Sequence, residues 1–232
     1  MIRVKNVTKS FGQRTLWENA SFTVQKGEML ALTGPSGCGK STLLNCLGLL
    51  EEVDHGEIFI DGKDVTKSRA GARRRFRRDK VGYLFQNYAL IENANMYHNL
   101  AVAVGGRPGR FLKRDIFEAA LHDVGLGGRG NEMVFQLSGG EQQRLALARL
   151  LVKEPAVVLA DEPTGALDEE NSAMVIAHLR KMAEAGCAVI IATHSKLVEK
   201  GCDSTLSLGK DVIGGDNLVM SLGPDSVSSL SC

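Results

Sequence analysis

The chain has 232 residues, of which 44% are hydrophobic, and a formal net charge of +1 at pH 7. This suits one large α/β domain, or a core domain with an inserted subdomain. The near-neutral net charge favours neither nucleic acid nor an anionic membrane as a partner. No apolar run approaches the roughly 20 residues of a membrane span, and the first residues lack the apolar core of a signal peptide.

The five cysteines form no C-x-x-C pair and their number is odd. This usage indicates reduced thiols in a cytosolic protein.

The first third of the chain is rich in short apolar stretches. Residues 1–32 alternate apolar and polar stretches, with turn signals at Gly12 and at Lys26-Gly27. This pattern predicts antiparallel strands. Residues 28–33 form a short apolar run suited to a buried strand, and leucines recur at helical spacing from Leu43 onward.

A glycine-rich loop lies between that strand and that helix. Residues 34–42 fit the phosphate-binding pattern G-x4-G-K-[ST]. Glycines let backbone N–H groups point at phosphate oxygens, Lys40 brings a positive charge to the β- and γ-phosphates, and the Ser41 hydroxyl can ligate Mg²⁺. The alternative is a glycine-rich turn with an incidental lysine. The candidate nucleotide-binding residues are Gly34, Pro35, Ser36, Gly37, Cys38, Gly39, Lys40, Ser41 and Thr42.

A strand over 57–60, a basic segment and a second apolar strand over 81–85 follow, and the last ends at Gln86. The basic segment, 69–80, holds seven basic side chains and one acid. We interpret it as a solvated helix face rather than a patch for nucleic acid or lipid headgroups.

Residues from about 88 to 150 have little β-branched sequence and two helical patterns, over 111–124 and 140–151. They predict a helical insertion in an α/β core.

These patterns divide the single domain into parts. The core comprises 1–87 and 152–213, the helical subdomain comprises 88–151, and the Gly/Ser-rich residues 214–232 are interpreted as a C-terminal tail with little pattern.

Two more apolar strands, over 156–160 and 188–192, are followed by polar side chains. Asp161 and Glu162 come after the first strand and His194 after the second, with a helix beginning near Asp168 between them. Apolar strands separated by helices predict a parallel sheet covered on both faces, with ligands at the carboxyl ends of its strands.

The stretch Leu137-Ser138-Gly139-Gly140-Glu141 precedes the second helical pattern. A serine before two glycines can cap a helix and leave N–H groups open to an anion, which predicts a second phosphate-binding helix start. An ordinary capped helix is the alternative.

With these motifs in order, residues 2–210 resemble the ABC-type ATPase subunits. Those subunits carry a Walker A loop, a Q-loop glutamine, an LSGGQ-like signature, a Walker B carboxylate pair, a D-loop and a switch histidine. The matching stretches here are 34–42, Gln86, 137–141, 157–162, 166–168 and His194. The resemblance implies a P-loop NTPase fold with a RecA-like parallel core, an antiparallel β subdomain and an inserted α-helical signature subdomain.

The resemblance also implies ATP and Mg²⁺ as ligands. Lys40 and the loop amides would hold the β- and γ-phosphates. Ser41 and Asp161 would serve Mg²⁺, and Gln86 would sense Mg²⁺ or water.

Three further residues gain implied roles. Glu162 matches the general base that polarises the attacking water, and His194 matches the histidine that contacts the γ-phosphate. Phe11 lies where the family places an aromatic ring that stacks on adenine, and core packing is the alternative for it.

The signature residues Ser138, Gly139, Gly140 and Glu141 would complete the nucleotide site of a second copy. Two chains would then sandwich two ATP molecules. The resemblance also implies a separate transmembrane permease, a location at the cytoplasmic face of the cell membrane, and no nucleic acid partner.

The stretch 161–168 is similar to the DEPTGNLD run of the subgroup with lipoprotein-release, macrolide-efflux, cell-division and peptide-export ATPases, with Ala166 in place of asparagine. We therefore expect an exporter of peptide, lipid-linked or drug-like substrates. The alternatives are a cell-division or other non-transport ATPase and an importer subunit.

Overall fold

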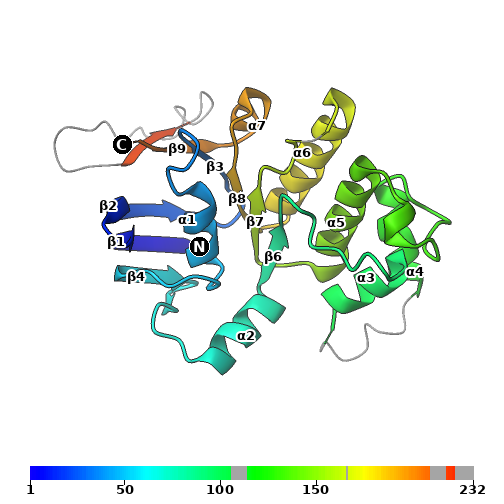
Figure 1. Cartoon of the computed structure of the whole chain (residues 1–232), viewed down its shortest axis with the longest axis horizontal. Helices are drawn as coiled ribbons and strands as arrows, with labels where there is room; N and C mark the ends of the chain where they lie inside the picture. The colour runs from blue at the N-terminus through cyan, green and yellow to red at the C-terminus, as the bar shows by residue number, and fades with distance from the viewer. Residues whose placement is uncertain (106–113, 166, 210–217, 223–232) are drawn as a thin grey trace, which may run out of the picture.

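The computed structural model is built from two β-sheets and a group of helices (Figure 1). Among the described residues, no helix combines the length and the hydropathy of a membrane span. The described residues are 1–105, 114–165, 167–209 and 218–222. Ala166, the beginning of the predicted 111–124 helix and most of the predicted tail lie outside them.

The first sheet has four antiparallel strands in the order β2-β1-β4-β5. Its strands are β1 (Ile2–Phe11), β2 (Arg14–Val24), β4 (His55–Ile60) and β5 (Lys63–Asp64). Buried and more exposed residues alternate along parts of β1 and β2, which is the pattern of a sheet with one face on the core. The antiparallel strands predicted for the N-terminal segment are confirmed.

The second sheet has six strands in the order β10-β9-β3-β8-β7-β6, and all neighbours are parallel except β10 and β9. β8 is buried along its whole length, and β3 and β7 are buried in all but their last residue. The predicted parallel sheet is confirmed. Its strands are β3 (Met29–Thr33), β6 (Val81–Leu84), β7 (Val157–Asp161), β8 (Ala188–Ala192), β9 (Ser204–Leu208) and β10 (Leu218–Leu222).

The helices lie on both sides of this second sheet. α3, α4 and α5 pack against one another, and Figure 1 shows them on the opposite side of the sheet from β1, β2 and β4. The helices are α1 (Lys40–Leu47), α2 (Ala70–Asp79), α3 (Met96–Ala103), α4 (Arg114–Asp123), α5 (Gly139–Lys153), α6 (Glu169–Glu184), α7 (Lys196–Lys200) and the short 3-10 helix η1 (Val134–Gln136).

Alternate residues of β3 face two separate apolar clusters. Met29 and Ala31 pack with residues of α5 and α6, whereas Leu30 and Leu32 pack with α1 and the first sheet. The parallel sheet is thus buried between two layers. Because its parallel strands run in one direction, their carboxyl ends meet at one edge, where the predicted site residues follow them.

Several elements differ from expectation. α3 was not predicted, because eight residues show too little periodicity; it begins at the N-cap Asn95, whose side chain accepts the His98 N–H at 2.8 Å. β9 was also missed, and β10 forms within the segment interpreted as a tail. The basic segment forms α2, which has no buried residue and therefore agrees with a solvated helix. The boundaries between core and helical subdomain stay a prediction.

Candidate functional site

The glycine-rich loop carries the chain from β3 into α1 at the carboxyl edge of the sheet. Gly34 has φ 137°, and a Cβ there would lie 2.2 Å from the Leu208 carbonyl oxygen. Gly39 has φ 100°, and a Cβ there would lie 2.9 Å from Trp17 Nε1. Both positions therefore require glycine for its backbone conformation and for close packing, and the loop is fixed against β9 and β2.

The Lys40 ammonium lies inside this loop. It is the first residue of α1, is only 7% exposed, and donates to the carbonyl oxygens of Gly34 at 2.9 Å and Pro35 at 3.3 Å. Its third neighbour is His194 Nε2 at 3.0 Å, which must be the unprotonated nitrogen in this contact. None of the described carboxylates lies within ion-pair distance of Lys40. A buried cation without a counter-charge fits an anionic ligand.

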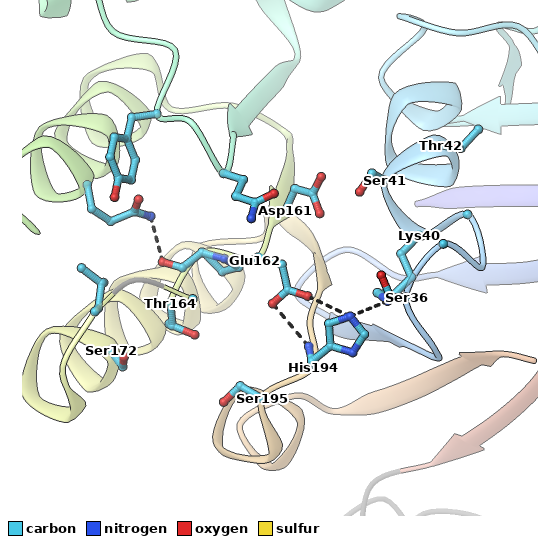
Figure 2. A pocket seen from close by; sticks show the side chains of 18 of the residues that line it. Ser36, Lys40, Ser41, Thr42, Asp161, Glu162, Thr164, Ser172, His194 and Ser195 are labelled. Atoms are coloured by element: carbon cyan, nitrogen blue, oxygen red, sulfur yellow. Dashed lines mark hydrogen bonds and ion pairs between the residues drawn. The ribbon is translucent and has the colours of Figure 1, made fainter. Parts of the chain in front are cut away.

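Glu162 and His194 follow the neighbouring strands β7 and β8. Glu162 Oε2 accepts the His194 N–H at 3.3 Å (Figure 2). The same oxygen accepts the Thr193 hydroxyl at 3.4 Å. Its Oε1 is buried without a hydrogen-bond partner and lies 3.7 Å from His194 Nε2. Glu162 also has φ 46°, in the left-handed region that is uncommon for a non-glycine residue. Glu162 is thus anchored through one oxygen, while the other keeps an unused capacity to accept a hydrogen bond.

Ser41, Gln86 and Asp161 line the same cleft, which has a volume of about 1160 Å³. Figure 2 shows Ser41 and Asp161 there. They come from α1, from the segment after β6 and from the end of β7. Within the described ranges, no group of three or more His, Cys, Asp and Glu residues converges as a complete metal site. The hydroxyl, amide and carboxylate oxygens present suit Mg²⁺ that takes its remaining ligands from phosphates and water.

The cleft brings together most of the predicted site residues. Phe11 is 52% exposed, so core packing is wrong for it, and the Lys9 ammonium lies 4.9 Å from the centre of its ring. Gly34, Pro35 and Cys38 belong to the loop but do not line the cleft. The predicted residues that do line it are Phe11, Ser36, Gly37, Gly39, Lys40, Ser41, Thr42, Gln86, Asp161, Glu162 and His194.

The signature residues do not line the cleft. Ser138 caps α5: its hydroxyl accepts the Glu141 N–H at 3.3 Å, and Glu141 Oε2 accepts the Ser138 N–H at 2.8 Å. Ser138, Gly140 and Glu141 line a separate pocket of about 240 Å³ that shares only Leu167 with the cleft, and Gly139 begins the helix beside them. One chain therefore does not bring the signature onto its own glycine-rich loop.

Arg129 holds the signature carboxylate. Its guanidinium contacts Glu141 and donates to both Glu132 carboxylate oxygens, at 3.0 Å to Oε1 and 2.7 Å to Oε2. The bond from Arg129, and next the Ser138 N–H, lower the pKa of Glu141 to about 2. Glu141 is therefore ionised at physiological pH, at the start of α5.

Sequence reasoning missed several residues of this region. Gln143 is 3% exposed, lines the cleft, and donates to the Pro163 carbonyl oxygen at 2.8 Å. Tyr88 also lines the cleft, and both Tyr88 and Ala89 have positive φ, 60° and 48°. That conformation costs a non-glycine residue about 1–2 kcal/mol. No local pattern signals these positions, because their partners are distant in the sequence.

The comparisons with known proteins place this site in a family. Residues 17–165 match the family model described as ABC transporter. The chain is 42% identical over 169 residues to a spermidine/putrescine import ATP-binding protein of Acetivibrio thermocellus, covering 72% of this chain and 46% of that one. It is 37% identical over 191 residues to a macrolide export ATP-binding/permease protein of Escherichia coli, covering 80% of this chain and 30% of that one.

A solved dimeric structure of a bacterial ABC transporter cassette aligns with a TM-score of 0.82 at 34% identity, over 90% of this chain and 94% of that one. The chain thus spans less than half the length of the two curated relatives above but nearly all of the solved cassette. Taken with the ordered motifs and the cleft, these matches show that the chain belongs to the ABC transporter family, as one of its ATP-binding domains.

Proposed function

We propose that this chain hydrolyses ATP with Mg²⁺ in the cleft, and that two copies close head to tail so that each completes the other's site. The observation that carries the proposal is the separation of the predicted groups. The glycine-rich loop, Asp161, Glu162, Gln86 and His194 share one cleft, whereas Ser138 of the same chain lies in another pocket.

The loop would bind the phosphates of ATP. Lys40 lies buried between loop carbonyls with no carboxylate partner, and α1 starts there, so both groups attract negative charge. Phe11 offers an exposed ring for adenine at the rim of the cleft. Ser41, Asp161 and Gln86 would hold Mg²⁺, which would neutralise phosphate charge.

Glu162 would act as the general base. Its Oε2 is held by the His194 N–H and the Thr193 hydroxyl, and its buried Oε1 has no hydrogen-bond partner, so Oε1 keeps its capacity to accept a hydrogen bond. A carboxylate in this position accepts a proton as the water attacks the γ-phosphate. His194, which touches Lys40 through Nε2, would turn to the γ-phosphate when the phosphate engages Lys40.

A second copy would supply the missing contacts. In a two-fold dimer, if residue i of one chain contacts residue j of its partner, then residue j of the first chain contacts residue i of the partner. The loop of each chain can therefore face the signature of the other, in both sites at once. Solved relatives support this arrangement: one is a dimeric ABC transporter cassette, and another is a dimeric post-hydrolysis cassette bound to ADP and phosphate, which aligns with a TM-score of 0.80 at 32% identity.

The dimer would drive a separate transmembrane permease from the cytoplasmic face of the membrane. The curated relatives include importers of polyamines and Fe(3+) ions and an exporter of macrolides, so they leave the direction open. The stretch 161–168 favours export of peptide, lipid-linked or drug-like substrates. If a neighbouring reading frame encodes a permease, its co-expression with this chain, followed by transport into inverted vesicles, tests the direction.

Hydrolysis is tested with Glu162→Gln. Trp17, the one tryptophan of the chain, packs under Gly39, so its fluorescence reports nucleotide in the loop. We expect the variant to bind ATP as wild type does and to hydrolyse it about 10²- to 10⁴-fold more slowly. Glu184→Gln, at the exposed far end of α6, is the matched control and should hydrolyse normally. A Glu162→Gln chain with a wild-type rate would show that another group is the base.

A further inference from the structure

The segment between β6 and α3 carries Gln86 and has an unusual backbone. Tyr88 and Ala89 are successive non-glycine residues in the left-handed region, with φ of 60° and 48°. Such a conformation is disfavoured for side chains with a Cβ, and it persists only where the surroundings hold it. Something outside the segment must therefore stabilise these two residues.

Arg149 of α5 makes the contacts that hold them. Its Nη1 donates to the Ala89 carbonyl oxygen at 2.6 Å, and its Nη2 donates to the Tyr88 carbonyl oxygen. The planar guanidinium presents two N–H donors side by side, which matches two adjacent carbonyl acceptors. Among the described residues Arg149 has no carboxylate partner, and burial lowers its pKa to about 10. Its hydrogen bonds to the protein therefore go to this segment.

Further along the segment, the backbone of Ile91 is also held by a helix, through Asn99 of α3. The Asn99 side chain, 1% exposed on α3, accepts the Ile91 N–H at 2.8 Å and donates to the Ile91 carbonyl oxygen at 3.1 Å. Gln86 lies two residues after the end of the core strand β6 and two residues before Tyr88. The backbone on the far side of Gln86 is thus attached to α5 and α3, not to the sheet.

The same helix α5 begins at the signature. Arg149 lies about three turns along α5 from the N-cap Ser138. The Tyr88 hydroxyl lies beside this end of the helix. A Cβ built on Gly139 would be 3.6 Å from the Tyr88 hydroxyl oxygen. The segment therefore contacts α5 near both ends of that helix. The Tyr88 and Ala89 carbonyls contact Arg149, and the Tyr88 side chain lies beside the signature.

We propose that Arg149 is a positioning residue that fixes the Gln86 segment to α5, so that Gln86 in one nucleotide site moves together with the signature that the same chain gives to the other site. This rests on the proposed function. Because α5 is a continuous helix, a shift of the signature would displace the Tyr88 and Ala89 carbonyls and, through them, Gln86. The two sites of a dimer would be mechanically linked through Arg149 of each chain.

The test compares Arg149→Lys with Gln86→Ala and the double variant in the full chain. A lysine keeps the charge but gives up the paired donors. We expect Arg149→Lys to bind ATP normally by Trp17 fluorescence and to lower kcat by about 10- to 100-fold, as misplacement of a catalytic group does. Adding Gln86→Ala to Arg149→Lys should change kcat by less than about twofold, because Gln86 is already displaced.

The matched control is Arg77→Lys. Arg77 also donates to the carbonyl of a left-handed non-glycine residue, Leu49, with φ 57°, at 2.7 Å, but outside the site. The Arg77→Lys substitution should lower Tm without changing kcat.

A further variant separates the link to α5 from local backbone strain. Glycine adopts the left-handed conformation without strain, so Ala89→Gly in the Arg149→Lys chain relieves the strain without restoring the link, and kcat should stay low. If Arg149→Lys does not fold, Arg149→Gln, which keeps two N–H donors without a charge, takes its place. The proposal is overturned if the effects of Arg149→Lys and Gln86→Ala multiply, if Arg149→Lys has a normal kcat, or if Ala89→Gly restores kcat in the Arg149→Lys chain. A wild-type chain that neither binds nor hydrolyses ATP would refute the proposed function itself.

Discussion

Arg129→Met removes the charge that holds the signature carboxylate while keeping much of the apolar stem. In the folded chain the Arg129 guanidinium bridges Glu141 and Glu132, and Glu141 in turn closes the cap on the Ser138 N–H. Without Arg129, Glu141 remains ionised next to a second carboxylate with no cation between them. The variant should therefore be less stable than wild type at neutral pH.

The magnitude follows from the pKa of Glu141, which lies at about 2 against an ordinary value of 4.5. That difference corresponds to about 3 kcal/mol of stability at neutral pH. Part of it comes from the Ser138 N–H, and the Arg129 and Glu141 side chains are 35% and 20% exposed, so solvent screens the pair. We expect Arg129→Met to cost about 1–2 kcal/mol, or about 2–8 °C in Tm for a chain of this size.

The sign of the pH dependence is fixed by the lowered pKa. A carboxylate whose folded pKa is lowered contributes stability above its unfolded pKa and loses it as the pH falls through the folded pKa. For Glu141 the contribution is complete above about pH 5, falls below pH 4.5 and is largely gone near pH 2. Wild type should thus lose more stability than Arg129→Met between about pH 5 and pH 3.

Urea unfolding of both chains across this pH range measures the difference. Lys196→Met is the control, because the Lys196–Glu199 pair at 2.8 Å joins a lysine that is 84% exposed and should be worth less than about 0.5 kcal/mol. The reasoning is refuted if Arg129→Met costs no more than the control, or if the gap between Arg129→Met and wild type does not narrow as the pH falls.

Two further substitutions test other parts of the account. Gly34→Ala should weaken ATP binding at least tenfold in a Trp17 fluorescence titration, because the new Cβ would lie 2.2 Å from the Leu208 carbonyl oxygen and the loop must shift; unchanged affinity would show that the loop tolerates the shift. Lys9→Met should lower stability by about 1–3 kcal/mol in urea unfolding, since the 5% exposed ammonium donates to the Glu51 carboxylate at 2.7 Å; a loss below about 0.5 kcal/mol would contradict this.

The features predicted correctly from the sequence are those encoded over short distances. The buried strands β3, β7 and β8 are continuous apolar runs, and the loop with Lys40 has a pattern tied to a mechanism. Strand β9 was missed because it carries alternating polar residues on the parallel sheet, and α3 because it has only two turns. Their structure depends on tertiary packing more than on local pattern.

The contacts around the signature and the Gln86 segment could not be predicted from the sequence, for a different reason. Arg149 binds backbone carbonyls 60 and 61 residues away, and Arg129 binds a carboxylate 12 residues away across a loop. Every residue has a backbone carbonyl, so the residue type does not show which carbonyl accepts a hydrogen bond, and no sequence pattern indicates these partners. From the sequence, a place for Phe11 in the nucleotide site rested on the resemblance alone. The exposure of its ring in the structure then decided against a position in the core.

The central claim is that each site is shared between two copies, and mixing two inactive variants tests it directly. Lys40→Met disables the loop of its own chain, and Ser138→Arg disables the signature that its chain lends to a partner. Each variant alone should be inactive in both sites. A mixed dimer has one site with both defects and one with neither, so the mixture should hydrolyse ATP well above the sum of the separate chains. A mixture no faster than that sum, although mixed dimers form, would contradict the shared site.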